Sequence, residues 1–174
     1  MKLIKLTAFP LVIFASVLLL NSCERDAEQK KTTDFSKIAI AMSGANEMPI
    51  STSPAIGKLD ISYSRDTRTL NYTLSWSGLS GAVTAIHING PAPLGYASPN
   101  TMQVVTITGI VKCPASANTS CGSFSGNMFV DGIVVKEADL LNGQYYMHIH
   151  TAGFPGGGLT ADPRGEIRAQ IAFQ

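Results

Sequence analysis

Strict alternation of apolar and polar residues is the feature that most limits the folds open to this 174-residue chain. In residues 68–76, RTLNYTLSW, every second residue from Leu70 to Trp76 is apolar and the residues between them are polar. A period of two is typical of a strand with one buried face. Further segments of this kind, separated by turn residues, are 37–42, 56–64, 83–89, 102–107, 122–130, 145–151 and 165–173.

Only residues 134–143, VVKEADLLNG, have a helical pattern, with Gly143 as the C-cap. Many short strands separated by turns favour two layers of antiparallel sheet. The sequence therefore predicts an all-β fold, an antiparallel Greek-key-like β-sandwich of about eight strands with one short helix.

The N-terminus has the layout of a secretory signal. Lys2 and Lys5 precede an uncharged apolar run at residues 6–20, which is shorter than the roughly 20 residues of a membrane span. The run ends in L-N-S-C, which resembles the lipobox of bacterial lipoproteins, although Asn21 is an unusual residue there. We prefer this interpretation to a secreted protein with an incidental cysteine, because Cys23 stands alone just beyond the apolar run. A lipidated Cys23 would attach the mature chain to a membrane of the cell envelope, periplasmic or surface-exposed, with palmitate as one of its acyl chains.

These features divide the chain into a signal peptide (1–22), a lipid-anchored flexible tether (23–35) and one domain (36–174). Without Lys2 and Lys5, 11 of the 13 basic residues remain, against 12 acidic residues. This balance leaves no basic stripe that would bind nucleic acid or an anionic membrane surface.

Two cysteines remain in the domain, Cys113 and Cys121. In an oxidising compartment they are expected to form a disulfide. The alternative, a metal-binding cysteine pair, lacks a nearby histidine or a second pair.

Polar side chains gather on three predicted strands, opposite the apolar residues of each strand. Period two places seven of them on the faces that we expect to point away from the core: His87, Asn89, His148, His150, Glu166, Arg168 and Gln170. The three histidines suit copper or zinc, with a carboxylate orienting one of the ligands. The alternative is a polar sheet face whose side chains hydrogen-bond to each other and to water.

Other catalytic patterns are weaker. The chain has no G-x-S-x-G motif and no evident pair of carboxylates for glycoside hydrolysis. The glycine-rich residues 154–166 lack the G-K-[ST] ending of a phosphate loop and are expected to form a flexible hairpin loop. We therefore expect no enzyme activity.

Four segments together resemble the CHRD domain, named after chordin: GANEMP (44–49), GLSGAVTAIHINGPA (78–92), GQYYMHIHT (143–151) and GEIRAQ (165–170). The resemblance implies an extracellular β-sandwich-like module, similar in pattern to Cu/Zn superoxide dismutase, with no established enzyme activity. Chordin's control of growth factors is not implied for a bacterial lipoprotein.

The family motifs also show an exchange of residue types. The usual H-I-H-G-P-A has Asn89 at its second histidine, and the usual V-N-V-H-T has His148 at its asparagine. The usual E-V-P-P reads E-M-P-I here, starting at Glu47. The exchange predicts that Asn89 and His148 face each other on adjacent strands, with Arg168 or Glu166 nearby.

Two functions remain open. The first is a non-enzymatic, lipid-anchored module of the cell envelope that binds an unknown envelope or extracellular ligand or has a structural role. The second is a metal-binding or redox protein that uses His87, His148 and His150, with Cu or Zn as its cofactor.

Overall fold

The computed structural model describes residues 33–154 and 164–174. Its strands are β1 (Asp34–Ser43), β2 (Ile56–Ser64), β3 (Thr69–Ser77), β4 (Val83–Asn89), β5 (Thr101–Val105), β6 (Val111–Lys112), β7 (Gly122–Phe129), β8 (Tyr145–Thr151) and β9 (Ile167–Ile171). Two 3-10 turns, η1 (Gly44–Asn46) and η2 (Ile107–Gly109), and one short helix, α3 (Glu137–Leu141), complete the described elements. The all-β prediction with one short helix is confirmed.

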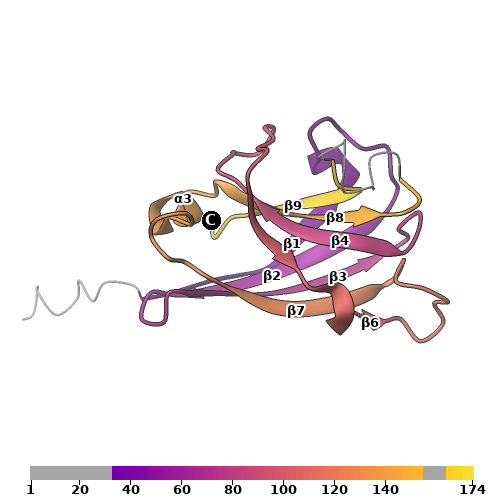
Figure 1. The fold of residues 1–174 in the computed structure, drawn as a ribbon, viewed down its shortest axis with the longest axis horizontal. Coiled ribbons are helices and arrows are strands. Elements are labelled where there is room, and N and C mark those ends of the chain that lie inside the picture. The colour runs from indigo at the N-terminus through magenta and orange to yellow at the C-terminus, as the bar shows by residue number, and fades with distance from the viewer. Residues whose placement is uncertain (1–32, 155–163) are drawn as a thin grey trace, which may run out of the picture. The chain divides into compact units, whose positions relative to one another are not determined.

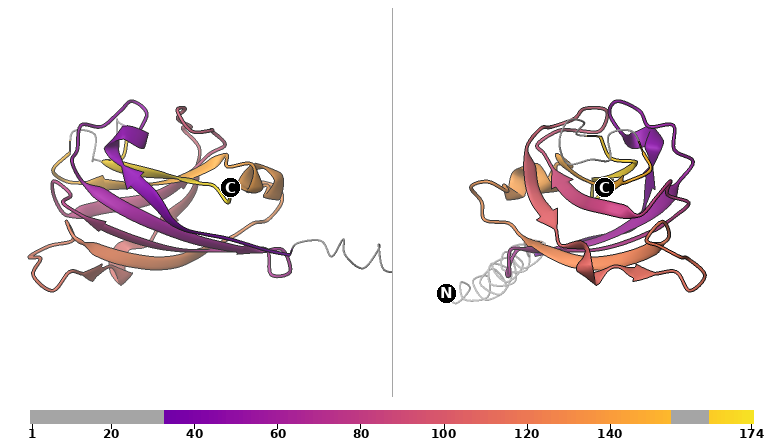
Figure 2. Two further views of the ribbon diagram at one scale, coloured as in Figure 1. Left: turned by 180° about the vertical axis from the view of Figure 1, so that it is seen from behind. Right: turned by 45° about the vertical axis from the view of Figure 1, so that its right-hand side comes forward.

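All strand pairs are antiparallel, and they form one sheet in the order β5-β4-β8-β9-β1-β2-β3-β7-β6. The sheet curls, so that β4, β8 and β9 lie across from β2, β3 and β7 (Figures 1 and 2). The two layers of the expected sandwich are thus the two halves of a single sheet. The core fills the space between them.

Alternation determines which side chains enter this core. On β3, β4, β8 and β9 the alternating apolar residues are expected to form the core, and all of the following are buried: Leu70, Leu74, Trp76, Ile86, Ile88, Met147, Ile149, Ile167 and Ile171. On β3 the intervening Asn71, Thr73 and Ser75 are exposed, as a half-buried strand requires. Removing this apolar area from water is the main stabilising contribution to such a fold.

The alternation fails in β1. The pattern placed Ile38 and Ile40 on the same face as Met42, but Ile38 is 75% exposed and only Met42 is fully buried. A register shift between Lys37 and Ile40 separates them, and Ala39 has a φ of 57° there. Such a bulge adds an unpaired residue and turns the preceding side chains to the other face.

The disulfide between Cys113 and Cys121 is confirmed, with a Cα–Cα distance of 5.4 Å. It closes the loop between β6 and β7. The backbone N–H of Cys113 also donates to the carbonyl of Cys121, at 3.1 Å. The loop is therefore fastened by both a covalent bond and a hydrogen bond.

Several predictions concern other parts of the chain. The signal peptide (1–22), Cys23, the tether up to residue 32 and most of the glycine-rich loop (155–163) lie outside the described residues. The last two tether residues, Asp34 and Phe35, belong to β1, and Phe35 packs against Tyr63 and Phe173. Among the described residues, no helix has the length and apolar character to cross a membrane.

The polar faces of β4, β8 and β9 point away from the apolar core, as expected, but they are buried as well. Of the seven polar residues assigned to these faces, six are at most 9% exposed, and His87 is partly exposed. The reason is that two segments cover this side of the sheet. Residues 90–100 follow β4, and residues 44–53 follow β1.

Hydrogen bonds hold both covering segments in place. Arg168 Nη1 donates to the Tyr96 carbonyl at 2.7 Å, and Asn89 Nδ2 donates to the Ser98 carbonyl at 3.3 Å. On the other side, Asn46 Nδ2 donates to the Arg168 carbonyl at 3.2 Å. The sheet face therefore forms the floor of a second, polar interior.

Candidate metal centre

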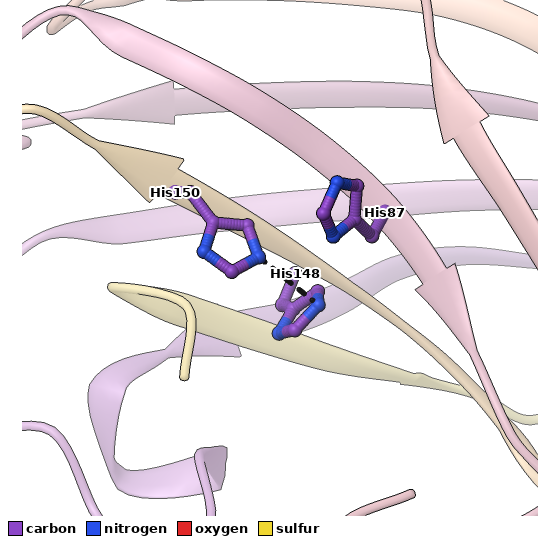
Figure 3. Close-up of side chains that lie close together, drawn as sticks. All are labelled: His87, His148 and His150. Atoms are coloured by element: carbon purple, nitrogen blue, oxygen red, sulfur yellow. Dashed lines mark hydrogen bonds between the residues drawn. The ribbon is translucent and has the colours of Figure 1, made fainter. Parts of the chain in front are cut away.

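The three histidines come together where β4 pairs with β8. His87 on β4 lies directly opposite His148 on β8, and His150 lies two residues further along β8 on the same face. Directly opposed residues in an antiparallel pair have Cβ atoms about 4.5–5.5 Å apart, and diagonal neighbours are within reach of long side chains. The register thus places three imidazoles in one compact group, with their rings turned toward one another (Figure 3).

The distances between the rings are short. The ring centroids of His148 and His150 are 4.4 Å apart, those of His87 and His150 are 4.7 Å apart, and those of His87 and His148 are 5.7 Å apart. One nitrogen from each ring lies within 4.8 Å of the other two. The Nε2 atoms of His148 and His150 are 3.3 Å apart.

This spacing suits a metal ion. Zinc–imidazole bonds of about 2.0–2.1 Å in a tetrahedral site place two ligand nitrogens about 3.3–3.4 Å apart. The His148–His150 pair already has that separation. The third nitrogen would have to approach by roughly 1–1.5 Å to complete the set.

The surroundings of His87 favour the neutral imidazole, which can bind a metal, over the protonated ring. Burial, together with the neighbouring His148, lowers the pKa of His87 to about 4. The ring is therefore neutral at physiological pH, which is the form that binds metals. Its Nε2 is buried and has no hydrogen-bond partner.

A carboxylate lies behind the cluster. Glu47 is 2% exposed, and its Oε1 is 3.6 Å from His148 Nδ1. Metal-binding histidines usually direct the ring N–H that does not face the metal at a carboxylate, carbonyl or water, which fixes the tautomer. If His148 bound a metal through Nε2, its Nδ1 would face Glu47 in this way.

The approach of Glu47 to His148 depends on Gly165. A Cβ at position 165 would lie 2.5 Å from Glu47 Oε1 and 2.8 Å from the Cβ of His148. Any side chain there would collide with both residues. Glycine at this position keeps the carboxylate within reach of the ring.

Arg168 lies beside this group and is fully buried. It is opposite His148 on β9, and its guanidinium is 3.5 Å from the centroid of the Tyr146 ring. Burial lowers the pKa of Arg168, while Tyr146 and Glu47 act to raise it. Glu47 thus faces both a histidine and a buried cation.

The other polar residues have partners of their own. Glu166 accepts hydrogen bonds from Ser53 Oγ at 2.6 Å, from Ser80 N and Oγ at 2.8 Å each, and from Thr151 Oγ1. Burial raises the pKa of the Glu166 carboxyl, but these hydrogen bonds outweigh it, and the pKa is below its ordinary value. Gln170 donates to the Gly143 carbonyl at 2.6 Å. Neither side chain has a hydrogen bond to a histidine among those described.

The expected pairing across the strands is partly right. Asn89 and His148 do lie on adjacent strands, and Arg168 is next to His148 as predicted. However, Asn89 faces Tyr146 and His148 faces His87, so the predicted direct pair is wrong by two residues. The carboxylate beside the cluster is Glu47 and not Glu166. Glu47 lies in the segment that resembles the family motif E-V-P-P, which was the only sequence signal for it.

Comparison with known proteins gives one result. The family model of the CHRD domain matches residues 38–171, which include every residue of the histidine cluster and Glu47. No curated protein and no solved structure matches the chain. The match covers most of the chain, and its β fold agrees with the curled sheet described above. The chain therefore belongs to the CHRD domain family.

Proposed function

We propose that this protein is a lipid-anchored module of the cell envelope that binds a transition-metal ion, copper or zinc, through His87, His148 and His150. The family match supports an extracellular type of β module. The lipobox-like sequence ending at Cys23 supports the anchor. One observation carries the metal-binding part: three imidazole nitrogens within 4.8 Å of one another, on the buried floor of a covered sheet.

The alternative for the cluster is a polar network that is complete without a metal. The hydrogen bonding argues against it. Within the described residues, the buried polar atoms that lack a partner all belong to this one region: Glu47 Oε1, His87 Nε2, Asn89 Oδ1, His148 Nδ1 and Arg168 Nε. An unsatisfied buried polar group costs about 1–3 kcal/mol. A bound metal would satisfy His87 Nε2 directly, and its charge would strengthen the attraction between His148 and Glu47.

The choice of metal follows from the donors. Imidazole nitrogens suit copper and zinc, whereas calcium and magnesium prefer oxygen ligands. Three protein ligands leave a further position open. Among the described residues, Glu47 is the carboxylate that lies against the cluster, and the role that we propose for the site is non-enzymatic metal binding.

The experiment is a titration of metal-free mature protein with Zn²⁺ and Cu²⁺, followed by calorimetry and, for copper, by electron paramagnetic resonance. One ion should bind per chain, with nitrogen couplings in the copper spectrum. The His150→Ala variant should lose most of the affinity.

The control is Asn89→Ala, which removes a buried polar side chain from the same face but no ring nitrogen. It should retain the affinity of the wild type. If wild-type protein takes up neither metal, or if the two variants behave alike, the metal site is refuted. The module would then be a binding or structural protein that uses another surface.

A further inference from the structure

We propose that three exposed apolar side chains at one end of the domain, Phe129, Ile133 and Val134, dock onto the lipid bilayer to which Cys23 is attached. We call these three residues the apolar tip. The proposal goes beyond metal binding and rests on the lipid-anchoring part of the proposed function.

The tip exposes three large apolar side chains. Ile133 is 80% exposed, Val134 is 60% exposed and Phe129 is 52% exposed. Ile133 and Val134 are consecutive in the connection between β7 and α3, and Phe129 is the last residue of β7. Grouped exposed apolar residues mark sites of interaction with proteins or membranes, whereas single ones need no explanation.

The loop is built to hold these side chains outward. Asp131 Oδ1 accepts hydrogen bonds from the backbone N–H groups of Ile133, Val134 and Val135, at 2.8–2.9 Å. Val135 is 4% exposed and anchors the loop in the core. The same turn that buries Val135 therefore leaves its two apolar neighbours facing solvent. A fixed loop loses little conformational entropy when it binds.

The tip lies at the end of the domain where the chain enters from the anchor. Phe129 is opposite Thr69 at the start of β3, and Asp34, the first residue of β1, is opposite Ser64 at the end of β2. Arg65, in the turn between β2 and β3, contacts both Phe35 and Glu137 of α3. The β2–β3 turn and the loop before α3 lie at the same end of the sheet (Figure 1).

The length of the tether keeps this end near the bilayer. Residues 24–33 separate Cys23 from Asp34. Even fully extended, the eleven Cα-to-Cα steps from Cys23 to Asp34 span at most about 40 Å, and a flexible chain of this length averages about 20 Å. An apolar tip so close to a membrane surface has a large local concentration of lipid available to it.

The partner that fits is the interfacial region of the bilayer and not a strongly anionic surface. Arg65 and Arg68 lie beside the tip, with the Arg68 guanidinium 4.8 Å from the Phe129 ring centroid. Arg65, however, is already paired with Glu137 at 2.8 Å. Insertion of apolar side chains into the headgroup and acyl boundary is therefore the expected contact, without a requirement for anionic lipid.

Docking would also orient the metal site. β8 begins with Tyr145, just after α3, and runs away from the tip toward His148 and His150. Glu47 follows β1 at the end opposite Asp34. With the tip on the bilayer, His148 and His150 would lie farther from the membrane than the start of β8.

In the test, the chain is attached to vesicles by chemical coupling in vitro, which replaces lipidation by cellular enzymes. When residues 23–174 are produced without the signal peptide, Cys23 is not acylated and is the one thiol outside the Cys113–Cys121 disulfide. It can be coupled to a maleimide lipid in phosphatidylcholine vesicles that contain brominated lipids, which quench tryptophan at short range. Both variants are made in a Trp76→Phe background, because the native Trp76 would otherwise contribute to the emission. The Ile133→Trp variant is compared with Ile56→Trp, because Ile56 is 64% exposed at the other end of β2.

Emission from Ile133→Trp should fall on brominated vesicles, as expected for a side chain at the acyl boundary. Emission from Ile56→Trp should not change. Equal quenching of the two variants, or none in either, would overturn the proposal. So would a change in Ile133→Trp emission that depends on protein concentration without vesicles, because the tip would then bind a second copy of the chain. The result does not depend on whether cells lipidate Cys23, so a failure of anchoring and a failure of docking are distinguishable.

Discussion

Glu47 offers the sharpest test of how the candidate site works. Its Oε1 lies 3.6 Å from His148 Nδ1, in a position where only 2% of the residue is exposed. The change Glu47→Gln keeps the size and an acceptor oxygen but removes the negative charge. We expect the metal to bind more weakly, because a bound cation makes the His148 N–H more positive and the carboxylate stabilises that charge.

The magnitude follows from the distance. Two unit charges 3.6 Å apart interact by about 4–5 kcal/mol at an effective dielectric constant of about 20. The metal places only part of a unit charge on the ring, so about 1–2 kcal/mol is expected, which is roughly a 5- to 30-fold loss of affinity. This range overlaps the 10- to 100-fold effects that are typical of groups behind a metal ligand.

The assay is competition for Zn²⁺ between the protein and a chromophoric chelator at neutral pH. The matched control is Glu166→Gln, since Glu166 is also a buried glutamate of this region but is bonded to Ser53, Ser80 and Thr151. Its zinc affinity should stay within about two-fold of the wild type. Thermal unfolding of both variants identifies any general loss of stability. An unchanged affinity in Glu47→Gln, or an equal loss in Glu166→Gln, would show that the contact with His148 has no role.

Three further predictions concern anchoring, stability and pH. Cys23→Ala should abolish labelling by a palmitate analogue and release the protein from membranes; a variant that is still labelled and membrane-bound would contradict the lipoprotein assignment. Removing the disulfide by Cys113→Ala with Cys121→Ala should lower the free energy of unfolding by roughly 2–3 kcal/mol in denaturant titrations. Because the pKa of His87 is lowered to about 4 in the folded protein, against about 6.5 when unfolded, the unfolded chain binds the extra proton between these values. Metal-free protein should therefore lose about 1–2 kcal/mol of stability as the pH falls from about 7 to about 5, and His87→Gln should remove that part of the slope.

Much of the fold was open to prediction because alternation is a local property. The segment at residues 56–64 was predicted as a strand and is β2, with Leu59, Ile61 and Tyr63 all buried. In β1 the alternating pattern did not predict which side chains are buried. The bulge at Ala39 exposes Ile38, and period two contains no signal for an inserted residue. The two-residue strand β6 was too short to have a pattern at all.

The buried state of the candidate site could not be predicted for a different reason. Period two separates the two faces of a strand but says nothing about what covers them. Here the cover comes from residues 44–53 and 90–100, and it is fastened by long-range bonds such as that from Arg168 to the Tyr96 carbonyl, 72 residues apart. The same long-range folding brings Glu47 to His148, 101 positions later in the chain, so no local spacing could have paired them.

The strand register explains what the exchange of histidine and asparagine does in this chain. Position 89 lies opposite Tyr146, beside the Ser98 carbonyl, whereas position 148 lies opposite His87 and next to Glu47. The motifs that this chain resembles have histidines at the positions equivalent to 87, 89 and 150. Position 150 is opposite Ala85 and position 89 is opposite Tyr146, so along the strands these two positions lie on either side of position 87. Three histidines placed there would form an extended row. With His148 in place of a histidine at 89, the three rings form a triangle whose ring nitrogens lie within 4.8 Å of one another. The presence of histidine at position 148 thus gives a compact group of imidazoles in place of a row, with Glu47 lying against one of them.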